Sequence, residues 1–220
     1  MGCYTLFAVS LPNTLRSLSS RMFSSCCLLQ SITIPSSVGM MYGYIFDTCS
    51  SLTSIIIPNN VRLQEYAFRR CTALSNVILA NGVRIAGTYV FDSCVCLQSL
   101  VLPGTVTSTS DNTFSNCSSL SSIVVEEGVT NIGGSVFSNC YGLSSITLPS
   151  TVVSMGSGCF SNCFSLSYIK FKSVTPPQAV SGTFSSVPTT AKILVPAGTL
   201  ETYKSAANYP DPTTYTYEEY

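Results

Sequence analysis

The chain has 220 residues, of which 45% are hydrophobic and 9% are charged, with ten basic residues, ten acidic residues and no histidine. A formal net charge of zero provides no general attraction for nucleic acid or for an anionic membrane surface. Without histidine, the chain lacks the commonest general base and the commonest metal ligand. It also contains no phosphate-loop, nucleophile-elbow, zinc-peptidase or dinucleotide-binding motif. We therefore expect no enzymatic activity, no catalytic residue, no cofactor and no metal site.

Residues 1–22 are expected to form a partial N-terminal repeat. The spacing of Cys3, Leu6, Val9 and Leu11 matches part of a unit that recurs further along the chain, but no phenylalanine precedes it. We expect additional repeats upstream. No signal peptide is visible in this segment, and no apolar stretch of the chain reaches the length of a membrane-spanning helix.

Residues 23–183 contain seven tandem repeats of 22–24 residues. Each repeat begins with a phenylalanine, and a cysteine, a leucine and two apolar residues separated by one position follow at fixed distances. The phenylalanines of the repeats and of a shortened final coil are Phe23, Phe46, Phe68, Phe91, Phe114, Phe137, Phe160 and Phe184. The cysteines three positions later are Cys26, Cys49, Cys71, Cys94, Cys117, Cys140 and Cys163. A fixed period of this length is the sequence signature of a solenoid.

The repeat also predicts the local structure of each coil. Its paired apolar residues, such as Ile55 and Ile57, indicate a short strand with one face inward, and the first complete repeat offers Ile32 and Ile34. A proline such as Pro58 ends the strand because it has no N–H group to donate. The F-x-x-C-x-x-L segment suits a tight 3₁₀-like turn. Stacked coils pair their strands in parallel, so identical residues should form ladders through the core.

This unit closely resembles the BspA-like type of leucine-rich repeat, which is marked by C-x-x-L-x-x-I-x-I-P-x-x-V-x-x-I-G-x-x-A-F. The resemblance covers residues 3–196, most of the chain. It implies a leucine-rich-repeat solenoid, a curved right-handed superhelix built mostly from short parallel β-strands with 3₁₀ or irregular turns. The proline is replaced by Ala80, Glu126 and Lys172, which weakens individual turns and leaves the expected fold unchanged.

Residues 184–208 are expected to form a shortened last coil and a C-terminal cap. The segment 192–196 predicts the final strand, and the segment 199–207 predicts a short helix because its apolar residues share one face. In the resembled family a P-A-G-x-x-x-x-Y-K segment follows the last repeat, and solenoids need such a terminal cap. Residues 209–220 are expected to be a loose tail.

Eleven cysteines admit two interpretations, a disulfide framework or a set of small buried hydrophobic residues. Eight lie on the ladder when Cys3 is counted. Stacked cysteines would place their Cβ atoms at about the 4.8 Å strand spacing, whereas a disulfide prefers about 3.8 Å. We therefore predict free and buried thiols. The off-ladder Cys27 and Cys96 do not provide zinc-ligand spacing with their neighbours.

Three charged residues directly follow the phenylalanine in successive coils, namely Asp47, Arg69 and Asp92. They should fall on one line and form a small ion ladder of alternating sign. Exposed ion pairs contribute only about 0–1 kcal/mol, so we expect this ladder to fix register more than stability.

Two further surface features suggest ligands but have simpler explanations. Arg62 and Arg84 both follow the valine of a repeat and, with Arg70, would form a modest basic patch that contacts an anion or acidic glycan, or that is merely solvated. Asn116 begins a nominal glycosylation sequon, which is weak because it includes the ladder cysteine.

The residue between the two inward-facing strand residues points outward, on what we expect to be the inner curve of the solenoid. This outward row comprises Thr33, Ile56, Ile78, Val101, Val124, Thr147 and Lys170. A flanking row two positions earlier comprises Ser31, Ser54, Asn76, Ser99, Ser122, Ser145 and Tyr168. Four consecutive β-branched aliphatics in the outward row predict an exposed apolar stripe and a contact surface. The same residues also favour strands without any binding role, so both interpretations stay open.

Resemblance to BspA-like proteins implies a non-enzymatic interaction module of a cell-surface or secreted microbial protein. The implied partners are host extracellular-matrix or cell-surface proteins, or other microbes. A structural spacer that presents another domain is an alternative. The apolar stripe discriminates between the two, because a spacer would not need it exposed. Self-association through the stripe or the open N-terminal edge is a further alternative.

Overall fold

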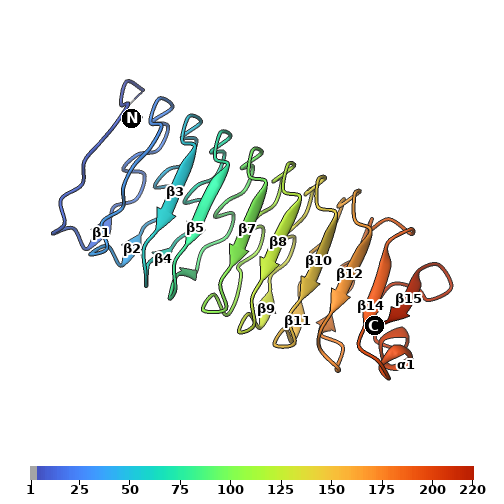
Figure 1. Ribbon diagram of the computed structural model, residues 1–220. Helices are drawn as coiled ribbons and strands as arrows, with labels where there is room; N and C mark the ends of the chain where they lie inside the picture. The colour runs from blue at the N-terminus through green and yellow to red at the C-terminus, as the bar shows by residue number, and fades with distance from the viewer. Residues whose placement is uncertain (1–3) are drawn as a thin grey trace.

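The structure is a computed structural model that describes residues 4–220. The chain winds into a parallel β-solenoid of about nine turns with almost no helix. Successive turns stack from the N-terminal to the C-terminal end (Figure 1). This arrangement confirms the predicted leucine-rich-repeat solenoid. Cys3, predicted to start the cysteine ladder, lies outside the described residues.

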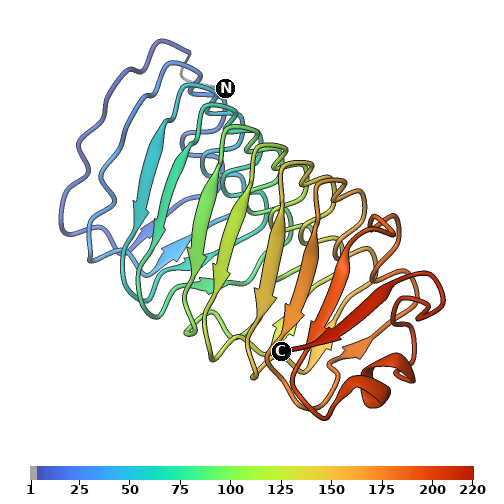
Figure 2. The same ribbon diagram turned by 45° about the vertical axis from the view of Figure 1, so that its right-hand side comes forward.

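One side of the solenoid is a row of four-residue strands, which we call the large sheet (Figure 2). All of its bonded neighbours are parallel, and paired residues occupy the same position of successive repeats, as Val101 and Val124 do. The bonding is interrupted between β5 and β7. The strands are β3 (Ser54–Ile57), β5 (Asn76–Leu79), β7 (Ser99–Leu102), β8 (Ser122–Val125), β10 (Ser145–Leu148), β12 (Tyr168–Phe171), β14 (Lys192–Val195) and β15 (Thr216–Glu219).

A second row of strands, two residues each, lies behind the large sheet in Figure 2, and we call it the small sheet. In each strand the second residue is buried and the first is not. The row is divided between β6 and β9. The strands are β1 (Ser17–Leu18), β2 (Met40–Met41), β4 (Arg62–Leu63), β6 (Arg84–Ile85), β9 (Asn131–Ile132), β11 (Ser154–Met155) and β13 (Gln178–Ala179).

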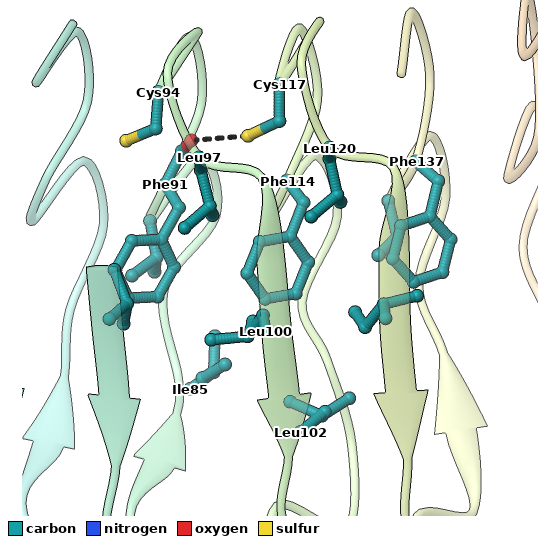
Figure 3. Close-up of a cluster of buried hydrophobic side chains, with 14 of the residues drawn as sticks. Ile85, Phe91, Cys94, Leu97, Leu100, Leu102, Phe114, Cys117, Leu120 and Phe137 are labelled. Carbon is teal, nitrogen blue, oxygen red and sulfur yellow. Dashed lines mark hydrogen bonds between the residues drawn. The ribbon is translucent and has the colours of Figure 1, made fainter. Parts of the chain in front are cut away.

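The core consists of ladders of identical residues, as the repeat predicts. Neighbouring phenylalanine rings from Phe23 to Phe184 are stacked, with centroids 5.2–6.0 Å apart. The ladder thiols from Cys49 to Cys163 each donate to the backbone carbonyl of the phenylalanine in the preceding coil. Figure 3 shows one such bond, from Cys117 Sγ to the Phe91 carbonyl at 3.2 Å. Burying a thiol therefore leaves its donor satisfied.

The segment around each phenylalanine forms a pair of irregular turns. Cys49 N donates to Phe46 O at 3.1 Å, and Leu52 N donates to Cys49 O at 3.1 Å, which is the i to i+3 spacing that we predicted. Tyr44 and Thr48, two residues before and after this phenylalanine, have φ angles of 61° and 62°. Left-handed residues on both sides prevent the turn from continuing as a 3₁₀-helix.

The first complete repeat lacks the strand that we expected at Ile32 and Ile34. Both side chains are buried, but no backbone hydrogen bond joins residues 31–34 to β3. A hollow of about 330 Å³ lies between the two segments. The prediction was wrong because burial of apolar side chains does not itself supply the hydrogen bonds that define a strand.

The C-terminal cap contains a shorter helix than we expected. Helix α1 (Leu200–Lys204) buries Tyr203 completely, and the Tyr203 hydroxyl donates to Ser173 O at 2.7 Å. The chain leaves the helix before Ala207, which is exposed and takes no part in the buried face. Tyr209 replaces it in the core, with its ring 5.6 Å from Phe171.

The C-terminal tail is ordered, which corrects our expectation of a loose segment. Strand β15 pairs in parallel with β14 and extends the large sheet. Lys192 Nζ lies 2.8 Å from Glu218 Oε1, and the Tyr220 hydroxyl donates to Phe171 O at 2.9 Å. Alternation of Thr and Tyr before Glu218 is a strand pattern, and the tail forms one because the open edge of β14 offers it hydrogen-bonding partners.

Candidate functional site: the outer face of the large sheet

The large sheet holds the predicted outward row on its solvent face. Alternation along each strand buries the first apolar residue, exposes the next and buries the third. Four consecutive members of the row form what we call the apolar stripe, with exposed fractions of 47–60%. The stripe consists of Ile56, Ile78, Val101 and Val124.

The strand register aligns the members of the outward row. Ile56 pairs with Ile78, and Val124 pairs with both Val101 and Thr147. Thr33, also exposed, lies before β3 in a segment that forms no strand. The structure therefore brings the predicted residues into one line across the sheet, apart from the interruption between β5 and β7.

The outward row is less accessible at its C-terminal end. Thr147 and Lys170 are only half-exposed, as are Ser145 and Tyr168 in the flanking row. Lys170 Nζ lies 3.4 Å from the centroid of the Tyr220 ring, a cation–π contact with the C-terminal tail. Lys170 is therefore engaged by the cap, and the accessible part of the face lies toward the N-terminal coils.

The flanking row supplies polar groups without charge beside the apolar stripe. Ser54, Asn76, Ser99 and Ser122 are exposed, and their side chains make no hydrogen bond to other described residues. An exposed hydroxyl or carboxamide in this state is available to a partner. Sequence reasoning missed one feature here, a hollow of about 420 Å³ between β5 and β7.

The expected ion ladder is present in part. Arg69 donates from Nε and Nη2 to the two carboxylate oxygens of Asp47, at 2.8 and 3.0 Å, and this bonding raises the pKa of Arg69. No ion pair joins Arg69 to Asp92 within residues 4–220, which corrects the prediction. The planar guanidinium turns to one carboxylate only. Asp92 instead accepts hydrogen bonds from Ser115 Oγ at 2.5 Å and Asn116 Nδ2 at 2.7 Å.

Asp92 also begins an asparagine ladder that the sequence analysis did not identify. Asn139 Nδ2 donates to Asn116 Oδ1, and Asn162 Nδ2 donates to Asn139 Oδ1, both at 2.8 Å. All three asparagines have φ near 60°, which this residue type tolerates. The repeated Ser-Asn-Cys triplet was the available signal. A glycan on Asn116 would disrupt this network, so the structure disfavours glycosylation there.

An aromatic stack lies beside the phenylalanine ladder. The rings of Tyr44 and Tyr66 are 4.6 Å apart, and those of Tyr66 and Tyr89 are 5.1 Å apart. Arg21 lies 4.5 Å from the Tyr44 centroid, and Arg69 lies 4.7 Å from the Tyr66 centroid. Because the ring faces contact one another and the guanidinium groups, this stack is best explained as a stabilising ladder.

The proposed basic patch is divided between two parts of the coil. Arg62 and Arg84 are paired neighbours in β4 and β6, and both are exposed. Arg70 lies on the phenylalanine turn of its coil instead of on the small sheet. The structure thus supports a pair of like charges on the small sheet and places Arg70 apart from it.

The ladder thiols have the environment of core residues. Burial raises the pKa of Cys49 and of Cys117 to about 12, and it raises the pKa of Cys94 well above its ordinary value. These thiols are protonated at neutral pH and are poor nucleophiles. None of the ten cysteines in the described part of the chain forms a disulfide. No cluster of three or more Cys, Asp or Glu side chains suited to a metal ion occurs among residues 4–220.

The repeat geometry agrees with a known family. The sequence profile described as "BspA type Leucine rich repeat region" matches residues 1–94, 62–185 and 107–208. This chain belongs to the BspA-type leucine-rich repeat family. Proteins of leucine-rich repeat families are generally protein-interaction modules. No curated protein sequence matches this chain.

Solved bacterial leucine-rich repeat proteins have a similar fold. A leucine-rich repeat protein from Bacteroides ovatus is 21% identical with a TM-score of 0.69, and the match covers 100% of this chain and 62% of that one. The leucine-rich repeat protein of T. pallidum is 28% identical with a TM-score of 0.65, covering 73% of this chain and 78% of that one. A leucine-rich cell surface protein from Faecalibacterium prausnitzii is 26% identical with a TM-score of 0.56, covering 94% and 64% respectively. Among residues 4–220, no helix is long and apolar enough to cross a membrane.

Proposed function

We propose that this BspA-type chain is a non-enzymatic protein–protein interaction module whose partner binds the apolar stripe. The stripe carries the proposal, because its four aliphatic side chains are 47–60% exposed in consecutive coils. Contiguous exposed apolar area usually marks an interaction surface. A solenoid presents such a surface along its whole length, which suits recognition of an extended partner.

Strand propensity alone explains the stripe poorly. Threonine has the same β-branched preference for strands and occupies the outward row at Thr33 and Thr147. Aliphatic residues replace it at the four positions between them, where the replacement exposes apolar surface to water. Burial against a partner would recover this cost, at roughly 25 cal/mol per Å² of apolar area removed from water.

The proposed setting is the surface of a microbial cell or the space outside it. Support comes from the BspA-type repeat itself and from the similarity to a protein described as a leucine-rich cell surface protein. In that setting the partner of the apolar stripe is an extracellular-matrix or cell-surface protein of a host, or a surface protein of another microbe.

Binding to immobilised extracellular-matrix glycoproteins and cell-surface protein extracts tests this function. The purified chain should bind at least one of them saturably, and the double variant Ile78→Glu, Val101→Glu should lose that binding. Val153→Glu is the matched control, because Val153 is also an exposed β-branched residue, 59% exposed, but it precedes β11 on the small sheet.

All variants must retain the circular dichroism spectrum of the parent chain. Binding retained by the double variant would remove the apolar stripe as the contact surface. If the parent chain and both variants stay monomeric and bind nothing, the interaction module is refuted in favour of a structural spacer. Concentration-dependent association of the parent chain alone would indicate a second copy as the partner.

A further inference from the structure

The large sheet is interrupted beneath the middle of the apolar stripe. Strand β5 bonds only to β3, and β7 bonds only to β8, although β5 and β7 are neighbours in both views (Figures 1 and 2). Within residues 4–220, no strand pairing joins β5 to β7. The junction is therefore the place where successive coils of the large sheet meet without a ladder.

Parallel pairing determines which backbone groups face this junction. In such a sheet each residue directs both its N–H and its C=O to one neighbouring strand, and the next residue directs them to the other. Ala80 N donates to Ile57 O, so residues 76, 78 and 80 direct their backbone groups toward β3. The alternate residues Val77 and Leu79 therefore direct their N–H and C=O groups away from β3. By the same rule, because Glu126 N donates to Leu102 O, Ser99 and Val101 direct their N–H and C=O groups away from β8. The backbone polar groups of these four residues thus face the junction, where no ladder joins β5 to β7.

The opposite side of the same junction is also open. Strand β6 pairs only with β4, and Arg84 and Thr107 both line a hollow of about 390 Å³, although Ser110 Oγ donates to Ile85 O at 3.2 Å. The repeat changes its spacing here, from Val83-x-Ile85 in one coil to Val106-x-x-Thr109 in the next. At the phenylalanine turn, however, the coils remain joined, since Phe91 N donates to Thr113 O at 2.8 Å. The interruption thus coincides with a change of coil spacing, although the coils at Val38 and Val61 differ in the same way and their strands β2 and β4 stay paired.

The hollow at this junction, which we call the β5–β7 groove, reaches the core. Its walls include Ile78, Val101 and Val124 of the apolar stripe. The inward-facing Val77 and Leu79, both members of the hydrophobic core, also line the groove and are 6% and 8% exposed. The groove thus offers an aliphatic pocket whose floor is the core itself.

The polar lining of the groove has the chemistry of a peptide group and no charge. Its polar side chains are Asn76, Ser99 and Ser122, and none of its lining residues is ionisable. Asn76 is the only asparagine in a flanking row that has serine at Ser31, Ser54, Ser99, Ser122 and Ser145. A carboxamide both donates and accepts, which matches the N–H and C=O of a peptide backbone.

We propose that the β5–β7 groove binds an extended, uncharged segment of the partner protein, with one aliphatic side chain inserted at the junction and a main-chain amide paired with Asn76. This deepens the proposed function and rests on it. A charged side chain would lose its hydration in this groove without finding an opposite charge. A neutral aliphatic side chain buries apolar area, and the peptide backbone satisfies the carboxamide and hydroxyl groups around it.

Methyl-labelled protein and a blocked, uncharged peptide of sequence GSVSISVSG provide the test. The NMR signals of the methyl groups of Ile78, Val101 and Val124 should shift and saturate with added peptide. Val101→Glu should abolish the shifts, and Asn76→Ser should weaken binding by about tenfold through loss of one donor–acceptor pair. Thr147→Glu, a charge on the same row away from the groove, should leave the affinity within about twofold.

Three results would overturn the groove. Unmoved methyl signals would do so, as would equal shifts with a control peptide in which glutamate replaces the isoleucine. If Thr147→Glu weakened peptide binding as much as Asn76→Ser does, the peptide would bind a diffuse surface of the large sheet and not the groove. The groove can fail while the proposed function holds: if matrix-protein binding is lost in the Ile78, Val101 double variant but unchanged by Asn76→Ser, the module stands and the groove does not.

Discussion

Alkaline pH should unfold this protein through its buried thiols. The perturbation is a rise in pH from 8 to 9.8 with a phosphine reductant present, so that no disulfide forms. Burial holds the pKa of seven thiols well above the value of about 8.5 that cysteine has in an unfolded chain. These thiols are Cys49, Cys71, Cys94, Cys117, Cys140, Cys159 and Cys163.

The sign follows from the raised pKa. Below the unfolded pKa both states hold the proton, and the thiols have no effect on the pH dependence. Above it only the folded chain keeps the proton, so each thiol lowers the free energy of unfolding by about 1.4 kcal/mol per pH unit. Seven thiols together lower it by about 10 kcal/mol per pH unit, which is comparable to the whole stability of an ordinary domain.

Urea titrations followed by circular dichroism at several pH values measure this slope. Tyrosine in the unfolded chain ionises with a pKa of about 10, so buried tyrosines add to the slope above about pH 9, and the cysteine variants isolate the contribution of the thiols. Cys117→Ala should reduce the slope by about 1.4 kcal/mol per pH unit, whatever it does to stability at pH 7. Cys96→Ala is the matched control, since Cys96 is exposed and its removal should leave the slope in place. A free energy of unfolding that stays flat from pH 8.5 to 9.8 would refute the reasoning.

Other perturbations address the core, the coil spacing and the cap. Phe114→Ala should cost about 3–5 kcal/mol in urea unfolding, because the ring is completely buried between two stacked rings; a cost below about 1 kcal/mol would argue against a tight ladder. Gly87→Ala should cost about 1–3 kcal/mol, since its Cβ would overlap the backbone of the preceding coil, whereas Gly39→Ala, with open space around it, should be neutral; equal effects would contradict the stacking distance. Glu219→Ala should speed hydrogen exchange at the Gly198 amide, which donates to that carboxylate at 3.0 Å; unchanged exchange would contradict the role of β15 in the cap.

The repeat made the fold predictable because every core residue has a counterpart one period away. Phe91, Cys94 and Leu97 lie against the same residue types in the next coil, so one interpretation of the unit applied along the whole solenoid. The outward row was predictable for the same reason, since alternation in a strand determines which residues face solvent. Its exposure at Ile56 and Val124 agrees with that expectation.

The structure differs from the sequence predictions where a residue has no equivalent in other repeats, or where the stacking of two coils determines which groups come into contact. The tail has no phenylalanine or cysteine of the repeat, so its pairing with β14 was invisible to a periodic analysis. Asp92 lies on the predicted line, but the direction of the Arg69 side chain gave it neutral partners. The β5–β7 groove lies between two coils whose strands both keep the repeat pattern, so its position depends on how the coils stack and not on a residue that the period could identify.

A charge scan along the outward row tests the central claim most directly. Each member from Thr33 to Thr147 would be replaced singly by glutamate, and the affinity for a bound matrix or cell-surface protein would be measured on folded variants. The account predicts that the loss of affinity is greatest at Ile78, Val101 and Val124 and declines toward both ends of the row. A flat profile, or a maximum at the Val153→Glu control on the small sheet, would contradict the assignment of the large sheet as the binding face.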